Sequence, residues 1–185
     1  MRNELLEQNI GDFNPNYMKS HNWGNIFKPH EHVALLNETI VYDGVTLFRI
    51  IAISDFKNAK RGDIGGYVES LSNISKEAWI ADNAKVYGEA MITDKAVACG
   101  NAIIKDQAVV SKHAQISENA TVKDTAKIFG WAKISGNSVV CKMGQVSQFA
   151  TVSGNAEVRG FVYGHSILTC HAFVEEYKQV PGLAA

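Results

Sequence analysis

Apolar residues recur with a period of six through the second half of the chain. Alanine occupies every sixth position from Ala78 to Ala132, and a second apolar residue follows each alanine two positions later. These second positions are Ile80, Val86, Ile92, Ala98, Ile104, Val110, Ile116, Val122, Ile128 and Ile134. The spacing continues upstream through Ile74 and Val68, and downstream through Val140, Val146, Val152 and Val158. A single repeated unit therefore makes up about half of the chain.

This period excludes a helix and predicts short strands. A helix advances about 100° per residue, so a period of six would spread the alanines around it and leave no single apolar face. In an extended segment, residues two positions apart point to the same side. Polar pairs such as Asp82-Asn83, Gly100-Asn101 and Gly136-Asn137 separate the apolar pairs, and they suit tight corners with positive φ. Each unit is therefore predicted to be a strand followed by a corner.

The corner residues predict that three units close one coil. Asn83, Asn101, Asn119, Asn137 and Asn155 are spaced by 18, so a three-sided coil would stack them in one column. The other two corner columns would hold Glu89, Gln107, Thr125 and Met143, and Glu77, Lys95, His113, Trp131 and Phe149. Stacked asparagine amides can hydrogen-bond along a column. We therefore expect an asparagine ladder at one corner.

The segments ISENAT (116–121), VSGNAE (152–157) and IADNAK (80–85) resemble the repeats of hexapeptide-repeat proteins. The resemblance covers about residues 65 to 176. It implies an all-β fold, a left-handed parallel β-helix that forms a three-sided prism of about six coils.

The repeat changes phase after Val158. Val162, Leu168 and Val174 keep the spacing of six, but two residues have been lost. Such a deletion belongs at a corner or marks the start of a terminal cap.

The chain is predicted to have three parts: an N-terminal arm and β-hairpin cap (1–64), the β-helix (65–176) and a C-terminal tail (177–185). The arm has little periodicity apart from a short helix expected near Asn3 to Gln8. In ETIVYDGVTLFRIIAIS (38–54), Asp43-Gly44 separates two β-rich runs, which predicts a hairpin. We expect this hairpin to cover the open end of the first coil.

Arg49 to Val68, RIIAISDFKNAKRGDIGGYV, is similar to the N-terminal segment of the YdcK-like proteins. These are bacterial and phage hexapeptide-repeat proteins that are often labelled putative acetyltransferases. The similarity covers about 20 residues in addition to the repeat. It therefore indicates the fold of the chain better than it indicates an activity.

Composition and charge exclude several classes of partner. The net charge of −1 gives no reason to expect nucleic-acid binding. The sequence has neither an 18-residue apolar run nor a basic, apolar leader, so we expect no membrane span and a cytoplasmic location. Cys99, Cys141 and Cys170 lack paired spacing, and free thiols are expected.

The hexapeptide resemblance implies one enzymatic alternative, an acyltransferase that uses acetyl-CoA. Members of that family typically work as trimers, with the acyl donor in a groove between prisms and a histidine base in or beside an inserted loop. His165, His171 and His113 are the candidate bases, although the repeat has no insertion between Ala78 and Val158. No zinc site is expected, because His165 and His171 are six residues apart and fall on successive sides of the coil.

One outward column carries positive charge. Tyr87, Lys105, Lys123, Cys141 and Arg159 are spaced by 18. The tyrosine and the three cations could hold a small anion, such as a phosphate or nucleotide. The alternative is a solvated face with no ligand.

Two groups of outward apolar residues predict an interface. The first coils present Trp79, Met91, Val97, Ile103 and Val109, which either the N-terminal residues or a second subunit should cover. Later coils present Phe129, Trp131, Met143, Phe149 and Phe161, an aromatic and methionine group typical of interfaces. This favours a homotrimer.

The leading hypothesis is a non-catalytic, homo-oligomeric binding protein. A specific form of it is a phage-encoded protein that inhibits or sequesters a host factor or a small anionic ligand. Two alternatives remain open: the acyltransferase, and a structural protein in which prisms stack end to end.

Overall fold

The computed structural model describes residues 27–30, 32–75 and 77–182. The helix expected near Asn3 to Gln8 lies outside the described residues. So do most of the predicted arm and residues 183–185 of the predicted tail.

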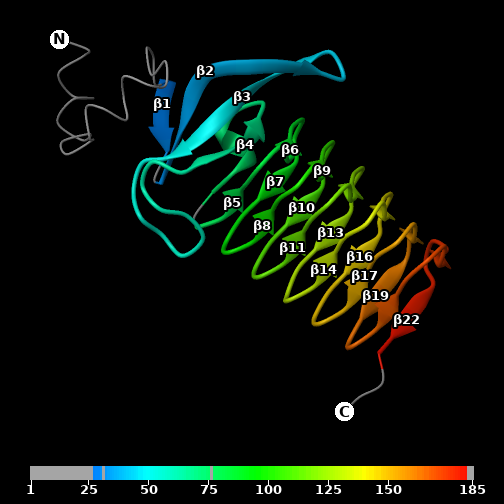
Figure 1. Ribbon diagram of the computed structural model, residues 1–185. Helices are drawn as coiled ribbons and strands as arrows, with labels where there is room; N and C mark the ends of the chain where they lie inside the picture. The colour runs from blue at the N-terminus through cyan, green and yellow to red at the C-terminus, as the bar shows by residue number, and fades with distance from the viewer. Residues whose placement is uncertain (1–26, 31, 76, 183–185) are drawn as a thin grey trace, which may run out of the picture.

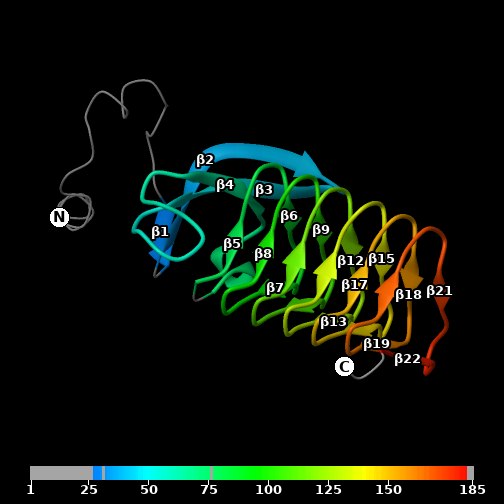
Figure 2. The same ribbon diagram turned by 60° about the horizontal axis from the view of Figure 1, so that its bottom comes forward.

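Each six-residue unit forms a short strand and a corner, and the strands stack into the three faces of a prism (Figures 1 and 2). Face 1 contains β4 (Ile64–Val68), β6 (Lys85–Val86), β9 (Ile103–Ile104), β12 (Thr121–Val122), β15 (Val139–Val140), β18 (Glu157–Val158) and β21 (Phe173–Val174). Face 2 contains β7 (Met91–Ile92), β10 (Val109–Val110), β13 (Lys127–Ile128), β16 (Gln145–Val146), β19 (Phe161–Tyr163) and β22 (Gln179–Pro181). Face 3 contains β5 (Trp79–Ile80), β8 (Val97–Ala98), β11 (Gln115–Ile116), β14 (Lys133–Ile134), β17 (Thr151–Val152) and β20 (Ile167–Leu168). The predicted all-β, three-sided parallel β-helix is confirmed.

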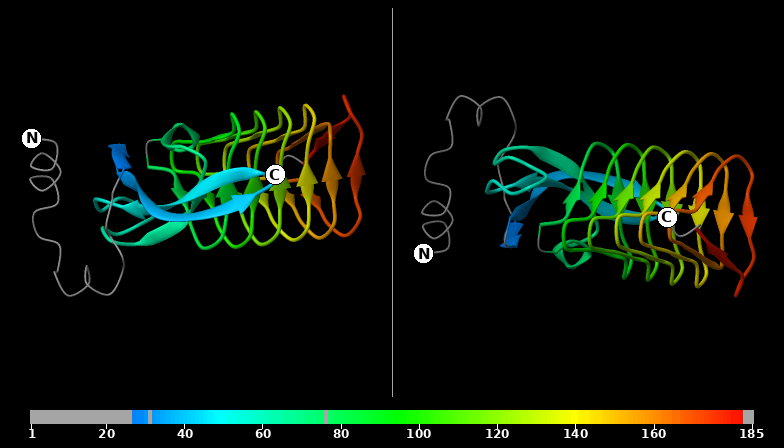
Figure 3. Two further views of the ribbon diagram at one scale, coloured as in Figure 1. Left: turned by 90° about the horizontal axis from the view of Figure 1, so that it is seen from above. Right: turned by 90° about the horizontal axis from the view of Figure 1, so that it is seen from below.

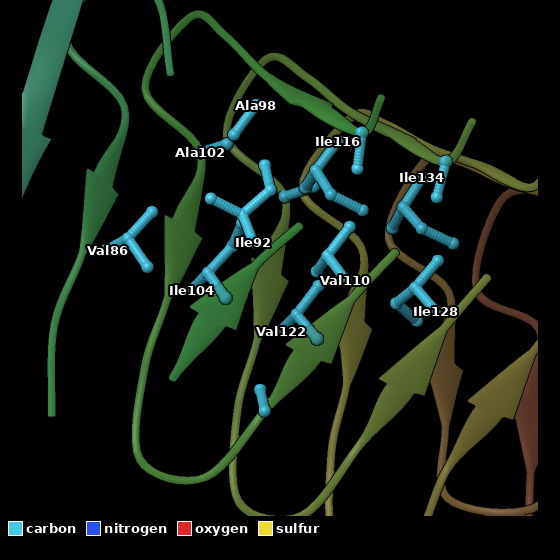
Figure 4. Packing of buried hydrophobic residues seen from close by; sticks show 14 of the residues in the cluster. Val86, Ile92, Ala98, Ala102, Ile104, Val110, Ile116, Val122, Ile128 and Ile134 are labelled. Carbon is cyan, nitrogen blue, oxygen red and sulfur yellow. The ribbon is translucent and has the colours of Figure 1, made fainter. Parts of the chain in front are cut away.

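Parallel pairing stacks each residue on the residue 18 positions later. Val110, for example, pairs with Ile92 below and Ile128 above. The repeated alanines and aliphatic residues point inward, where most are fully buried (Figure 4). Burying one valine or isoleucine side chain contributes about 1.5–3 kcal/mol, so every coil adds to the same continuous core.

Most corners have a position with positive φ, most often occupied by glycine or an acidic residue. Glu118 (φ 58) and Gly136 (φ 69) occupy this position in consecutive coils of one corner. The backbone N–H of Gly136 donates to Glu118 Oε2 at 2.7 Å. The acidic side chain therefore joins its corner to the next coil.

The predicted asparagine ladder is confirmed from Asn101 to Asn155, at the corner between faces 3 and 1. The Nδ2 of Asn101 donates to the Oδ1 of Asn119 at 3.2 Å, and the series continues through Asn137 to Asn155. Asn155 is followed in the column by His171, whose Nε2 lies 3.4 Å from Asn155 Nδ2.

The predicted loss of two residues is located at the corner between β18 and β19. Only Arg159 and Gly160 connect these strands, and pairing changes to a 16-residue spacing, with Gln145 opposite Phe161. A Cβ on Gly160 would lie 2.3 Å from the carbonyl oxygen of Glu175, so the shortened corner requires glycine. Coils continue beyond the deletion, and β22 extends the β-helix past residue 176.

The N-terminal strands extend face 1 with antiparallel pairing. β1 (Phe27–His30), β2 (Val33–Tyr42) and β3 (Val45–Ala52) precede β4 in this ten-stranded sheet, and the 3-10 helix η1 (Leu71–Asn73) follows β4. The hairpin predicted at Asp43-Gly44 is confirmed, because both residues have positive φ and Tyr42 pairs with Val45. The strand β1 was not predicted.

The hairpin does more than extend the first coil, because it runs along the outside of the prism (Figure 3). Its tip reaches two consecutive coils, where the Asp43 carboxylate accepts hydrogen bonds from Tyr87 and Lys105. Ile103 packs against the cluster under the hairpin. Trp79 is buried and makes an edge contact with Phe56, with 5.7 Å between the ring centroids. Residues N-terminal to the coils therefore cover two of the outward apolar residues predicted to need a cover.

Candidate functional site

An aromatic column runs along the corner between faces 2 and 3. Its members in successive coils are Glu77, Lys95, His113, Trp131, Phe149 and His165. The rings of His113 and Trp131 meet edge to face with centroids 4.0 Å apart, and those of Phe149 and His165 stack with centroids 5.0 Å apart. We call this series of six residues the aromatic column.

The repeat explains why these side chains point outward together. Each residue of the column stands directly before an inward small residue, such as Ala132 after Trp131 or Ser166 after His165. Consecutive side chains point to opposite sides of an extended segment, both in the strand and in the residues that lead into it. Every coil therefore places one side chain of the column at the same corner.

His165 belongs to the aromatic column because of the two-residue deletion. A constant spacing of 18 from Phe149 would have reached Ile167, so the sequence repeat alone did not connect His165 with Trp131 and Phe149. The β17–β20 pairing, in which Thr151 lies opposite Ile167, uses a spacing of 16 and makes the connection. The phase change after Val158 was the signal that could have revealed it.

A groove of about 480 Å³ lies beside the N-terminal half of the aromatic column. Its lining residues are Glu77, Asp94, Lys95, Lys112, His113, Gly130 and Trp131. The Nζ of Lys95 lies 3.7 Å from Glu77 Oε2. The side chain of Asn58 donates to the carbonyl oxygens of Glu77 and Lys95, which anchors this end of the corner to the N-terminal loop.

The large aromatic rings that project from the aromatic column lie in its C-terminal half. Trp131 is 50% exposed and Phe149 is 54% exposed. The column therefore combines a groove at one end with projecting rings at the other.

The three candidate catalytic histidines do not form one site. His113 and His165 belong to the aromatic column, three coils apart, whereas His171 ends the asparagine ladder at a different corner. The imidazole of His113 packs against Trp131, that of His165 stacks on Phe149, and that of His171 approaches the Asn155 amide. The Nδ1 of His113 is buried and has no hydrogen-bond partner among the described residues. The three imidazoles therefore lie at separate places on the prism.

The predicted interface residues lie at three places on the prism. Trp131 and Phe149 are in the aromatic column, and Phe129 (37% exposed) stands at the start of the same corner. Phe161 is half-buried on β19 of face 2. Met143 lies on the other side of face 2, at the corner between faces 1 and 2, and is 46% exposed. The structure therefore brings Phe129, Trp131 and Phe149 to one corner, whereas Phe161 lies on face 2 and Met143 lies at another corner.

The predicted cationic column forms, and Asp43 already meets its first members. The hydroxyl of Tyr87 donates to Asp43 Oδ2 at 2.7 Å, and Lys105 Nζ donates to the same oxygen at 3.1 Å. Burial and the Asp43 carboxylate raise the pKa of Tyr87, and the hydrogen bonds from Tyr87 and Lys105 lower the pKa of Asp43. The anion bound at this end of the column belongs to the hairpin itself.

The far end of the cationic column is also paired within the chain. Arg159 Nε donates to Glu157 Oε1 at 2.6 Å, and the guanidinium lies 5.0 Å from the ring centre of Phe173. Cys141 lies between Lys123 and Arg159, and burial, followed by the Glu157 carboxylate, raises the pKa of its thiol. Lys123 stands between these two occupied ends.

Cys99, Cys141 and Cys170 are free thiols. No group of three or more His, Cys, Asp or Glu residues that could hold a metal ion is found in residues 27–30, 32–75 and 77–182. Over the same part of the chain, no helix has the length and apolar character needed to cross a membrane.

Comparison with protein-family models gives no match, and comparison with curated proteins finds no similar sequence. The resemblance to YdcK-like proteins therefore gains no support from either comparison. The chain is a three-sided parallel β-solenoid of about six coils, a fold consistent with hexapeptide-repeat proteins.

Proposed function

We propose that this chain is a non-catalytic interaction protein that associates with copies of itself through the aromatic column. The observation that carries the proposal is the exposure of Trp131 and Phe149 in adjacent coils of one corner. Large aromatic side chains that project side by side are typical of the energetically dominant part of protein interfaces. Contiguous apolar patches of this kind mark interaction sites on soluble proteins.

The uninterrupted coils support a binding role over acyl transfer. Every corner from β5 to β18 connects its strands without an inserted loop. The candidate bases His113 and His165 use their ring faces and edges for packing against Trp131 and Phe149. A general base needs an imidazole within hydrogen-bond reach of its substrate, and packed rings serve an interface better.

The test is the mass of the protein in solution, measured by light scattering after size-exclusion chromatography. The wild-type chain should have a mass of at least twice 20.2 kDa. Trp131→Ser combined with Phe149→Ser should shift it to the single-chain mass. The matched control is Ile167→Ser with Phe173→Ser, because these residues are 72% and 50% exposed but lie on faces 3 and 1.

Two outcomes would contradict the proposal. A wild-type chain that stays monomeric at high micromolar concentration would remove self-association and favour capture of a host protein or a small anionic ligand. Equal loss of association in the control variant would show that general surface hydrophobicity, and not the aromatic column, drives assembly.

A further inference from the structure

We propose that two copies of this chain pair side by side and antiparallel along the corner between faces 2 and 3. The two-fold axis of the pair passes between His113 and Trp131. This inference rests on the proposed self-association and adds its geometry and stoichiometry. A dimer with this symmetry uses the same surface patch on both copies, so the patch must be complementary to itself.

The aromatic column is complementary to itself when one copy is reversed. Reversal about the axis places Glu77 opposite His165 of the second copy, Lys95 opposite Phe149, and His113 opposite Trp131. These rows pair a carboxylate with an imidazole N–H donor, an ammonium with an aromatic ring, and two aromatic rings. Each is a recognised favourable contact.

A parallel arrangement of the same corner lacks this complementarity. Copies at the same height would bring Glu77 next to Glu77 and Lys95 next to Lys95. Juxtaposed like charges are how interfaces suppress wrong arrangements. The charges at the N-terminal end of the aromatic column therefore disfavour a parallel trimer built on this corner.

The shape of the corner agrees with the charge pattern. The groove extends from Glu77 to Trp131, and the projecting rings extend from Trp131 to Phe149. Reversal places the projecting half of each copy against the grooved half of the other. Concave and convex surfaces then meet twice, once on each side of the axis.

The neighbouring positive-φ column is compatible with the same axis. Asp94, Lys112, Gly130 and Gln148 follow one another in this column. Reversal pairs Lys112 with Gly130, which offers no side chain to obstruct the lysine, and pairs Asp94 with Gln148. The intrachain ion pair of Lys95 with Glu77 leaves 43% and 41% of these side chains exposed, so both retain surface for the second copy.

A cross-linking experiment on full-length chains tests the arrangement. Asp94→Cys and Gln148→Cys would be made separately in a chain that also carries Cys99→Ser and Cys170→Ser. The expected result is a covalent dimer when the two variants are mixed and treated with a short bismaleimide, and little dimer when either is treated alone. The control mixture is Gln107→Cys with Thr125→Cys, at the corner between faces 1 and 2, which should not cross-link.

The solution mass distinguishes failure of the antiparallel arrangement from failure of self-association itself. A mass of twice 20.2 kDa together with selective cross-linking supports the antiparallel pair. A trimer, efficient cross-linking of Asp94→Cys with itself, or equal cross-linking of the control mixture would overturn this arrangement while leaving self-association standing. A monomer would overturn the proposed function as well.

Discussion

At the scale of single residues, the corners require a side chain that tolerates positive φ and leaves room for the next coil. Glycine tolerates positive φ and leaves room for the next coil. Asp and Glu also occupy this position, and their carboxylates accept a hydrogen bond from a backbone N–H of the next coil. Asp106, for example, accepts from the backbone N–H of Asp124 at 3.0 Å. The frequency of glycine and acidic residues at the positive-φ corner positions is therefore a consequence of stacking.

We predict that Gly136→Ala is markedly more destabilising than Gly44→Ala. Both residues have positive φ (69° and 78°), so alanine introduces similar backbone strain, about 1–3 kcal/mol. A Cβ at Gly136 would also lie 2.6 Å from backbone atoms of Gly154, whereas Gly44 has no atom within 4 Å. Overpacking adds about 1–3 kcal/mol, which urea unfolding should detect. Equal losses would mean that the next coil moves aside without cost.

At the scale of elements, the hairpin shows what local sequence can and cannot predict. Asp43-Gly44 is a local signal, because a two-residue turn needs positive φ at both positions. The place where the tip lies depends on Asp43 meeting Tyr87 and Lys105, which are distant in sequence. Periodicity contains no information about such a contact.

The aromatic column likewise has members that the sequence repeat predicted and one that it did not. Periodicity predicted the three-sided coil, the asparagine ladder and the members of the aromatic column from Glu77 to Phe149. His165 was missed because the column was followed at a constant spacing of 18, whereas the two-residue deletion after Val158 shortens the spacing to 16, as the pairing of Gln145 with Phe161 shows. The covering of Trp79 by Phe56 likewise depends on a loop outside the repeat.

We predict that docking of the hairpin tip is pH-dependent at both extremes. The pKa of Asp43 is lowered in the folded state, so its contribution is present above the ordinary value of 3.8 and is lost as the pH falls through the folded pKa. The pKa of Tyr87 is raised, so its contribution is lost as the pH rises above the ordinary value of 10.0, where the undocked tyrosine ionises. NMR of ring-labelled tyrosine, with Tyr87→Phe for assignment, should follow both transitions.

The variant that tests this latch is Asp43→Asn. Removing the carboxylate should bring the pKa of Tyr87 down toward its ordinary range, because one of the causes of its increase is lost. Glu89→Gln is the control, since it removes a carboxylate that accepts from Gln107 on the neighbouring corner. If the titration of Tyr87 is the same in Asp43→Asn and wild type, the tip is not held by this contact.

At the scale of the whole molecule, the two ends of the prism differ. Backbone N–H groups of each coil donate toward the C-terminal neighbour, as Thr151 does to the carbonyl oxygen of Ser166 at 2.8 Å. The N-terminal end of face 1 is extended by β1, β2 and β3. At the opposite end, β20, β21 and β22 are the last strands of their sheets within the described residues. In end-to-end stacking, the C-terminal coil of one copy would meet the N-terminal end of the next. On face 1 that end has no free parallel strand, because β3 already pairs with β4.

We predict that the Ile167 amide exchanges with solvent at least about tenfold faster than the Thr151 amide, as expected for an edge that opens locally. The two residues are directly paired between β17 and β20, so they share a face. They differ chiefly because Thr151 is followed by a further coil and Ile167 is in the last strand of this face within the described residues. Hydrogen exchange followed by NMR measures both amides in one sample. Side-by-side pairing along the aromatic column leaves this edge open and preserves the difference. Comparable protection of both amides at a concentration where the protein is associated would instead indicate that the last coil is covered, and would favour end-to-end assembly.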